Sequence, residues 1–170
     1  MPRRLATLSL FTLLAAATVA GADTWTVVEG SEVVFRSEAP MESFEGKTDQ
    51  VSGHLTCDLG DLGGELDLRF AVDLASIDTG IGMRNTHMRE RHLETDQYPE
   101  AVFTAREVVR VSAPSLAPGG SVEVTVRGTF DLHGVSRSRE LTAEVTRAAD
   151  GSLGVTASFL VSLKEHEIDR

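Results

Sequence analysis

The sequence contains one cysteine, too few basic residues to balance its acidic ones, and no recognisable catalytic motif. Cys57 cannot form a disulfide within its own chain, so an apolar core must stabilise the fold. The 26 acidic residues outnumber the 16 basic ones, giving a net charge of −10. A surface of this sign repels phosphate groups, which argues against nucleic-acid binding and against peripheral docking on anionic membranes.

The N-terminal segment has the pattern of a secretory leader. Arg3 and Arg4 precede an apolar run over residues 5–20, which is shorter than the ~20 residues of a membrane span. The run ends in Ala20-Gly21-Ala22, the small-x-small form of a signal-peptidase site. We therefore expect residues 1–22 to be a signal peptide, cleaved near Ala22, and the mature chain to be periplasmic or secreted. A retained anchor is the alternative.

The predicted mature chain begins at Asp23 and forms a single domain. Without the two leader arginines its charge balance is 14 − 26 = −12. We expect no stable membrane insertion of this mature part, residues 23–170.

Alternation of apolar and polar residues dominates the mature chain and predicts strands with one buried face. The clearest cases are residues 66–74 and 122–132. Weaker cases cover residues 25–28, 33–36, 51–57, 101–105, 141–145 and 155–161. Glycine- and proline-rich turns separate many of these runs, as in an antiparallel sheet. The fold class is therefore all-β: an antiparallel barrel or sandwich of about eight strands.

Residues 81–95 break this alternation and predict a short helix in a crossover. In an α-helix His87 and His92, at a spacing of five, would point about 140° apart. That spacing argues against a shared metal site of the H-E-x-x-H kind. We interpret the helix as closing one end of the barrel, where an arginine or histidine could meet the polar head of a ligand.

Other reactive groups have structural interpretations. Cys57 has the same inward parity as Leu55, which predicts a buried thiol rather than a reactive thiolate. Asp67 and Asp73 are expected on the outer face. No G-x-S-x-G elbow is present, and we predict no enzymatic activity. Periodicity alone leaves open whether the barrel interior is packed or holds an apolar ligand.

Several motifs, in order, resemble the YceI-like family. The first is Ser76-Ile77-Asp78-Thr79-Gly80, followed by Met83-Arg84, His87-Met88 and Tyr98-Pro99. The second is Gly128-Thr129-Phe130-Asp131-Leu132-His133-Gly134-Val135. With Phe44-Glu45-Gly46 and Val51-Ser52-Gly53, the resemblance covers most of residues 23–164.

The resemblance implies an exported, lipocalin-like barrel that holds a polyisoprenoid or similar amphiphile, such as a polyprenyl phosphate or a long-chain quinone. It implies no catalytic residue and no cofactor besides such a bound lipid. Two departures stand out. Asn85-Thr86 replaces residues that are commonly acidic in relatives, and the sequence stops at Arg170, where relatives continue into a final strand. Without that strand the barrel edges would be unpaired, which would favour a homodimer.

The function predicted from the sequence is binding of a long-chain lipid in an apolar barrel. The predicted ligand-binding residues are Phe35, Leu55, Cys57, Leu68, Phe70, Val72, Met83, Arg84, His87, Met88, Phe103, Val124, Phe130, Leu141 and Phe159. The alternatives are a metal-dependent or other enzyme using His87 and His92, and a structural or stress module with a packed core.

Overall fold

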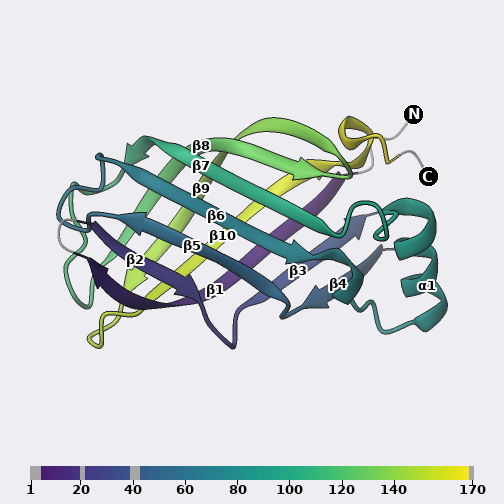
Figure 1. Ribbon diagram of the computed structural model, residues 1–170, viewed down its shortest axis with the longest axis horizontal. Coiled ribbons are helices and arrows are strands. Elements are labelled where there is room, and N and C mark those ends of the chain that lie inside the picture. Colours follow the sequence, from purple (N-terminus) through teal and green to yellow (C-terminus); the bar gives the residue numbers. More distant parts are fainter. Residues whose placement is uncertain (1–4, 20–21, 39–42, 169–170) are drawn as a thin grey trace.

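The described part of the chain forms one antiparallel sheet that curls into a barrel (Figure 1). The computed structural model describes residues 5–19, 22–38 and 43–168. Within them the strands are β1 (Leu5–Val19), β2 (Ala22–Val27), β3 (Glu32–Glu38), β4 (Ser43–Thr48), β5 (Val51–Cys57), β6 (Leu66–Asp73), β7 (Glu100–Val111), β8 (Ser121–Leu132), β9 (Val135–Arg147) and β10 (Leu153–Ser162). The helical segments are η1 (Leu74–Ser76), α1 (Gly82–His87), the π-helical turn η2 (Met88–His92) and η3 (Leu163–His166).

The strand order closes on itself. β5 to β10 pair in sequence order, and β10 pairs with β1 as well as with β9. On its other edge β1 pairs with β3 and then with β2, so β2 and β3 act as one interrupted strand. β4 and β5 together form the next strand of the barrel in the same way, since β4 pairs with β3 and β5 pairs with β2. The predicted class, an antiparallel lipocalin-like barrel of about eight strands with one short helix in a crossover, is confirmed.

β1 lies within residues 1–22, for which the sequence predicts a signal peptide. Residues 5–14 of β1 pair with β10 and close the barrel there. The sequence predicts open barrel edges, and the structure corrects this prediction, because β10 pairs with β1. The signal peptide itself stays a prediction.

Inward and outward faces follow the alternation of the sequence. In β8, Val122, Val126, Phe130 and Leu132 are buried. Glu123 and Arg127, from the same strand, are exposed. β7 departs from the pattern, because irregularities between Ala105 and Glu107 and between Val108 and Arg110 shift the register against β8. Bulges of this kind change which residues face inward, and they bring Val108 to the interior.

Gly128 allows β7 and β8 to pack closely. A Cβ atom at this position would collide with the carbonyl oxygen of Thr104 and would lie 2.8 Å from Cζ of Phe103. Glycine is therefore needed where the Phe103 ring crosses β8. This explains the single interruption of the apolar series in that strand.

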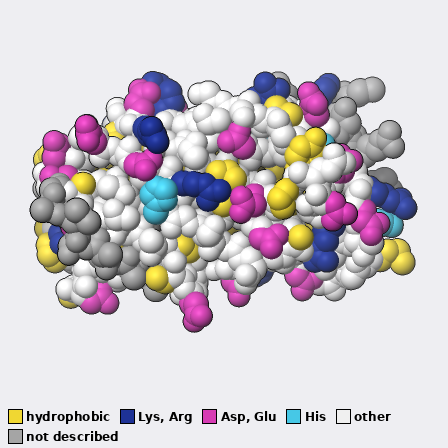
Figure 2. Space-filling view, viewed as in Figure 1, with side chains coloured by type: hydrophobic (Ala, Val, Ile, Leu, Met, Phe, Trp, Pro, Cys, Tyr) yellow, Lys and Arg dark blue, Asp and Glu magenta, His cyan; other side chains and the backbone are white. Residues whose placement is uncertain are grey.

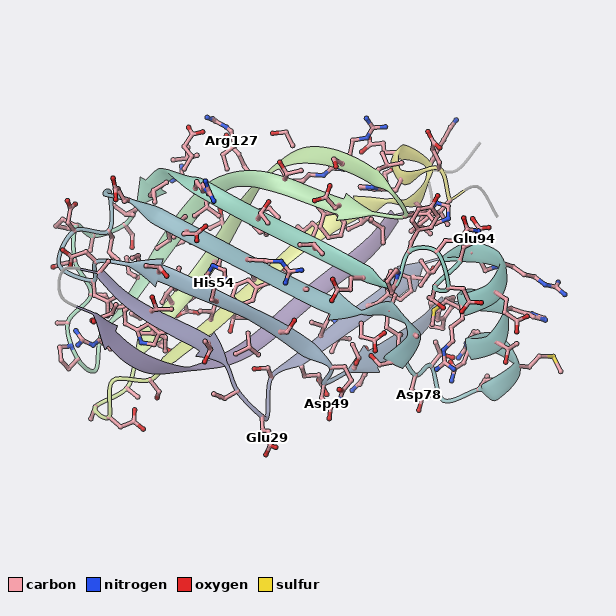
Figure 3. The ribbon with its side chains drawn as sticks, viewed as in Figure 1. Glu29, Asp49, His54, Asp78, Glu94 and Arg127 are labelled. Atoms are coloured by element: carbon pink, nitrogen blue, oxygen red, sulfur yellow. The ribbon has the colours of Figure 1, made fainter. Side chains whose placement is uncertain are left out.

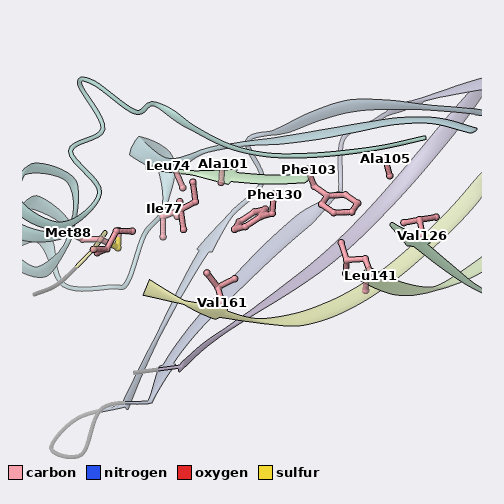
Figure 4. Packing of buried hydrophobic residues seen from close by; sticks show 13 residues of the cluster. Leu74, Ile77, Met88, Ala101, Phe103, Ala105, Val126, Phe130, Leu141 and Val161 are labelled. Atoms are coloured by element: carbon pink, nitrogen blue, oxygen red, sulfur yellow. The ribbon is translucent and has the colours of Figure 1, made fainter. Parts of the chain in front are cut away.

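The crossover between β6 and β7 places α1 at one end of the barrel (Figure 1). Met88 is buried against the cluster that contains Leu74 and Ile77. Figure 4 shows these three residues near Ala101, with Phe130 and Phe103 deeper in the barrel. The helix thus covers the barrel end, as predicted.

Among the described residues, no helix has the length and apolar character needed to cross a membrane.

Candidate functional site

Two adjoining cavities occupy the barrel. The inner cavity has a volume of about 110 Å³, and the side chains of the described residues that line it are apolar apart from the Cys57 thiol. The mouth cavity, of about 500 Å³, lies between the barrel end and α1 and includes the polar residues Ser37, Arg84, His87 and His92. Well-packed interiors hold few voids larger than a water molecule, so these volumes mark space that a ligand can fill.

The cavities meet at one level of the barrel. Val72, Ala101 and Phe130 line both of them. Phe130 is 3% exposed and packs edge-on against Phe159, with ring centroids 5.1 Å apart. An extended molecule that entered at the mouth would have to pass this level to reach the inner cavity.

Each residue of the predicted ligand-binding set lines one of the two cavities. The inner cavity includes Leu55, Cys57, Leu68, Phe70, Val72, Phe103, Val124, Phe130, Leu141 and Phe159. The mouth cavity includes Phe35, Met83, Arg84, His87 and Met88, together with Val72 and Phe130. That these residues bind a ligand stays a prediction.

Other residues line the two cavities but do not belong to the predicted ligand-binding set. Val126 and Val155 have the inward parity that the alternation already indicated. Val108 could not be placed, because the bulges in β7 that bring it inward have no clear sequence signal. Phe44 and Ile77 reach the mouth from a short strand and a loop, where no periodicity applies.

Cys57 is a buried free thiol, as expected. Burial raises its pKa to about 11, with a further contribution from the charges of Asp58 and Asp23. The thiol therefore stays protonated at neutral pH, and it contributes to the cavity wall as a small apolar group.

Arg84 is held in place at the mouth by its own loop. Its Nε donates to Oγ1 of Thr79 and its Nη2 to the carbonyl oxygen of Thr79, both at 3.0 Å. The guanidinium also lies 4.6 Å from the ring centroid of Phe44, a cation–π distance. These contacts fix a positive charge at the entrance rather than in the inner cavity.

Asn85 organises the same loop. Its Oδ1 accepts from the backbone N–H and the hydroxyl of Thr79, at 2.9 and 2.6 Å. Its Nδ2 donates to Oδ1 of Asp78 at 2.7 Å, and this bond, with one from the Gly80 N–H, lowers the pKa of Asp78. An ionised carboxylate at position 85 could not donate to Asp78, so the amide of Asn85 is needed for this bond.

The geometry of the two helical histidines differs from the prediction. The π-helical turn η2 begins at Met88, and the Leu93 N–H donates to the Met88 carbonyl oxygen at 2.8 Å. A π-helical turn bonds residues that are five apart in the chain, whereas an α-helix bonds residues four apart. His87 and His92, which are five apart, both line the mouth cavity. The prediction that the rings point apart, which assumed an α-helix, is therefore wrong. Within the described ranges, no three His, Cys, Asp or Glu side chains are grouped closely enough to hold a metal ion.

Two sequence motifs far apart in the chain meet beside the mouth. The His133 ring lies 4.6 Å from the Tyr98 ring, and its Nε2 lies 2.9 Å from Oε2 of Glu94. Its Nδ1 lies 3.2 Å from the carbonyl oxygen of His166, which can only accept, so Nδ1 donates. Glycine at position 134 allows the Tyr98 ring to pack this closely, since a Cβ atom there would lie 2.7 Å from the ring. The cluster joins the crossover, the β8–β9 turn and η3.

His166 anchors η3 under the barrel end. It is 0% exposed, and its Nδ1 donates to the carbonyl oxygens of Val135 and Leu132, at 3.0 and 3.3 Å. Burial lowers the pKa of this imidazole. Its edge also packs against Phe130, with ring centroids 5.4 Å apart.

Charged pairs also lie on the outer barrel, and of their members His54, Asp67 and Arg127 line neither cavity. Figure 3 shows His54 and Arg127 on the sheet, away from Asp78 and Glu94 at the helix end. Nε2 of His54 lies 3.2 Å from Asp67, which helps to lower the pKa of that carboxyl. Exposed pairs of this kind contribute little to stability.

Comparisons with known proteins agree with this architecture. The family model described as "YceI-like domain" matches residues 25–170, so β1 lies outside the matched part. No curated protein sequence matches the chain significantly. A polyisoprenoid-binding domain from Saccharophagus degradans, implicated in plant cell wall breakdown, has 18% identity and a TM-score of 0.52, covering 91% of this chain and 96% of that one. A mutant CJ YCEI protein has 19% identity and a TM-score of 0.59, covering 77% of this chain and 75% of that one.

Proposed function

The chain belongs to the YceI-like domain family, and from that premise we propose that it binds a polyisoprenoid or similar long-chain amphiphile. The hydrocarbon tail occupies the inner cavity, and the polar head stays at the mouth. The observation that carries this proposal is the wall of the inner cavity, which is apolar among the described residues apart from the Cys57 thiol and adjoins a mouth that includes Ser37, Arg84, His87 and His92.

Burial of the tail supplies the binding energy. Each buried methylene contributes about 0.8 kcal/mol, so a few isoprene units suffice for micromolar affinity, which corresponds to about 8 kcal/mol. A polar chain would lose its hydrogen bonds to water and find no partners in the inner cavity. The cavity therefore favours a hydrocarbon tail over a polar one.

The mouth favours a head with acceptor oxygens. Arg84 brings a fixed positive charge, and His87 and His92 bring imidazoles. The mouth lining, within the described residues, includes no Asp or Glu. A quinone carbonyl or a phosphate suits this set of groups, whereas an ammonium head does not.

The likeness to the Saccharophagus degradans domain supports this proposal, since that protein is described as binding a polyisoprenoid. We propose binding rather than catalysis. Within the described residues, no three His, Cys, Asp or Glu side chains are grouped closely enough to hold a metal ion, and Arg84, His87 and His92 supply the mouth with hydrogen-bonding groups for a ligand head.

Lipid extraction tests the proposal. The protein is purified without detergent and weighed intact by native mass spectrometry, and its organic extract is then analysed for lipids. We expect a stoichiometric prenyl lipid or quinone. Phe103→Asp, which puts a carboxylate in the inner cavity, should lose the lipid, and Phe103→Leu should retain it. An empty wild-type protein that also fails to take up added prenyl lipids would contradict the proposal.

We also propose that the protein is exported and that residues 1–22 are removed. Removal would take away β1, leaving the edge of β10 without its partner. Such an edge pairs readily with another strand, so a chain starting at Asp23 should form homodimers that the full chain does not. Light scattering of both forms tests the dimer. Recovery of the full-length mass from the periplasm of an expressing bacterium would contradict cleavage.

A further inference from the structure

Loops close the end of the inner cavity that lies opposite α1. At this end the chain connects β5 to β6, β7 to β8 and β9 to β10 (Figure 1). Leu59 and Leu62, from the first of these loops, line the inner cavity and are 6% and 8% exposed. Leu116, from the second loop, is buried in the same cluster but does not line the cavity. We call Leu59 and Leu62 the floor, because they end the cavity at the far side from the mouth.

Backbone hydrogen bonds between the loops hold the floor in place. The Leu62 N–H donates to the carbonyl oxygen of Pro114 at 2.9 Å, and the Leu116 N–H donates to that of Leu59 at 2.8 Å. Nη1 of Arg147 donates to the carbonyl oxygen of Leu116 at 3.1 Å, which ties the second loop to the end of β9. A ligand tail could pass the floor only by breaking such bonds and leaving polar groups without partners, which costs free energy.

The outer side of the floor is acidic. Within residues 58–65 the two leucines are buried, whereas Asp58, Asp61 and Glu65 are exposed. Figure 2 shows acidic side chains at this end of the molecule, on the left of the view. A hydrocarbon tail that emerged here would lie among hydrated carboxylates and would gain no binding energy from burial.

The depth of the inner cavity follows from the strands that line it. Along β8 the lining runs from Phe130, at the level where the cavities meet, to Val122 beside the loops, a difference of 130 − 122 = 8 residues. Eight residues span about 26 Å of strand, which a tilt of about 40° reduces to about 20 Å of depth. Three backbone bonds span about 3.5 Å when extended, so the four chain bonds of an isoprene unit span about 5 Å. The depth therefore suits about four isoprene units.

Resting on the proposed function, we propose that the floor determines how long a prenyl tail the protein can bury. Each isoprene unit adds affinity as long as it is buried, and a unit that would lie beyond the floor adds none. With about four units in the inner cavity and up to about two in the mouth, the affinity stops rising between about four and six units. The preferred ligands are therefore prenyl chains of middle length.

The size of a leucine side chain allows this length limit to be moved. Each leucine-to-alanine change deletes about three carbon atoms. Leu59→Ala with Leu62→Ala therefore deletes slightly more than the five carbon atoms of one isoprene unit, whereas either single change deletes fewer. The double variant should raise the limit by one unit, and the single variants should leave it unchanged. Leu62→Phe, whose larger side chain projects into the cavity, should lower the limit by one unit.

Displacement of a fluorescent prenyl probe from the full chain, by prenyl alcohols from geraniol to octaprenol, measures the limit. The matched control is Leu116→Ala with Leu153→Ala, which deletes the same number of atoms from the same buried cluster at positions that line neither cavity. For the alcohol one unit longer than the wild-type limit, the double floor variant should bind between about tenfold and about a thousandfold more tightly than the wild type. Geraniol should bind both equally, and the control should keep the wild-type limit.

The outcomes separate this inference from the proposed function. A wild type that binds no prenyl alcohol of any length would overturn the proposed function. A wild-type affinity that keeps rising through octaprenol, or an equal shift of the limit in the two double variants, would overturn the inference alone. If the double floor variant does not fold, Leu62→Phe decides, because the inner cavity adjoins this position and has room for its ring. An unchanged limit in that variant would then overturn the inference.

Discussion

Replacing Ala101 with phenylalanine should separate the mouth from the inner cavity. Ala101 is 6% exposed and, with Val72 and Phe130, lines both cavities at the level where they meet. A ring at this position would occupy the passage that the tail of a ligand has to cross. Since cavities of about 110 and 500 Å³ adjoin the site, the ring has room, and the overpacking cost should stay near the low end of about 1–3 kcal/mol.

The effect on binding should depend on chain length. An isoprene unit has five carbons, so excluding one unit from the inner cavity loses about 4 kcal/mol, or about a thousandfold in affinity. A short prenyl alcohol such as geraniol, which fits within the mouth, should lose little affinity. Long ones such as geranylgeraniol should lose most of their advantage over geraniol.

Calorimetric titration of a series of prenyl alcohols, together with urea unfolding, measures both effects. The control is Val102→Phe, which adds a ring on the neighbouring position of β7, where the side chain lines neither cavity. The reasoning is refuted if Ala101→Phe stays folded and still binds longer chains more tightly to the same degree as the wild type.

Three further predictions concern separate parts of the fold. Gly128→Ala should lower the free energy of unfolding by about 2 kcal/mol or more in urea titration, because its methyl group would collide with the Thr104 carbonyl. Asn85→Asp should speed amide hydrogen exchange in the loop before α1 at pH 7, since two carboxylates would then face each other, and the effect should fade as acid protonates Asp78 or its new neighbour. Stability should decline as the pH falls below about 6.5, because burial lowers the pKa of His166 from 6.5 and the unfolded chain then binds the proton more readily, so that His166→Gln flattens the decline.

Each of these predictions has a matched control. Gly154→Ala should be milder than the change at Gly128, because its Cβ would meet only the Thr146 hydroxyl, at 2.6 Å, which can rotate away. For the second prediction, the double variant Asp78→Asn with Asn85→Asp again pairs an amide with a carboxylate. It should return the hydrogen exchange of the loop to the slower wild-type rate. Leu160→Ser, at an exposed position and without a titratable group, should leave the pH profile unchanged between pH 7 and about 5.5. Equal stability losses in the two glycine variants would contradict the first prediction, and failure of the double exchange to slow hydrogen exchange would contradict the second. A flattened pH profile in Leu160→Ser would contradict the third.

The barrel and much of its lining could be predicted from the sequence because the inward parity of a strand is a local property. Val72, Val124 and Phe130 show this, since the residues beside them already set which face is buried. The bulges of β7 could not be predicted, because they depend on how β7 pairs with β8. Val108 therefore had no assignment.

The mouth was less predictable, because it is built by parts of the chain that only the fold brings together. Tyr98 and His133 belong to motifs that were recognised separately, and their contact follows from the position of the crossover against the β8–β9 turn. The orientation of His87 and His92 depends on one π-helical turn, and the sequence pattern does not distinguish such a turn from an α-helix. The leader pattern likewise reveals nothing of the pairing that β1 makes with β10.

Photo-crosslinking with a prenyl lipid tests the central claim most directly, because it places each end of the ligand. One reagent has a diazirine at the end of the tail, and a second has it beside the head. We expect the tail reagent to label inner-cavity residues such as Leu55 and Val124, and the head reagent to label His87 or its neighbours in α1. Tail crosslinks confined to the outer surface, for example at Leu160, would contradict it.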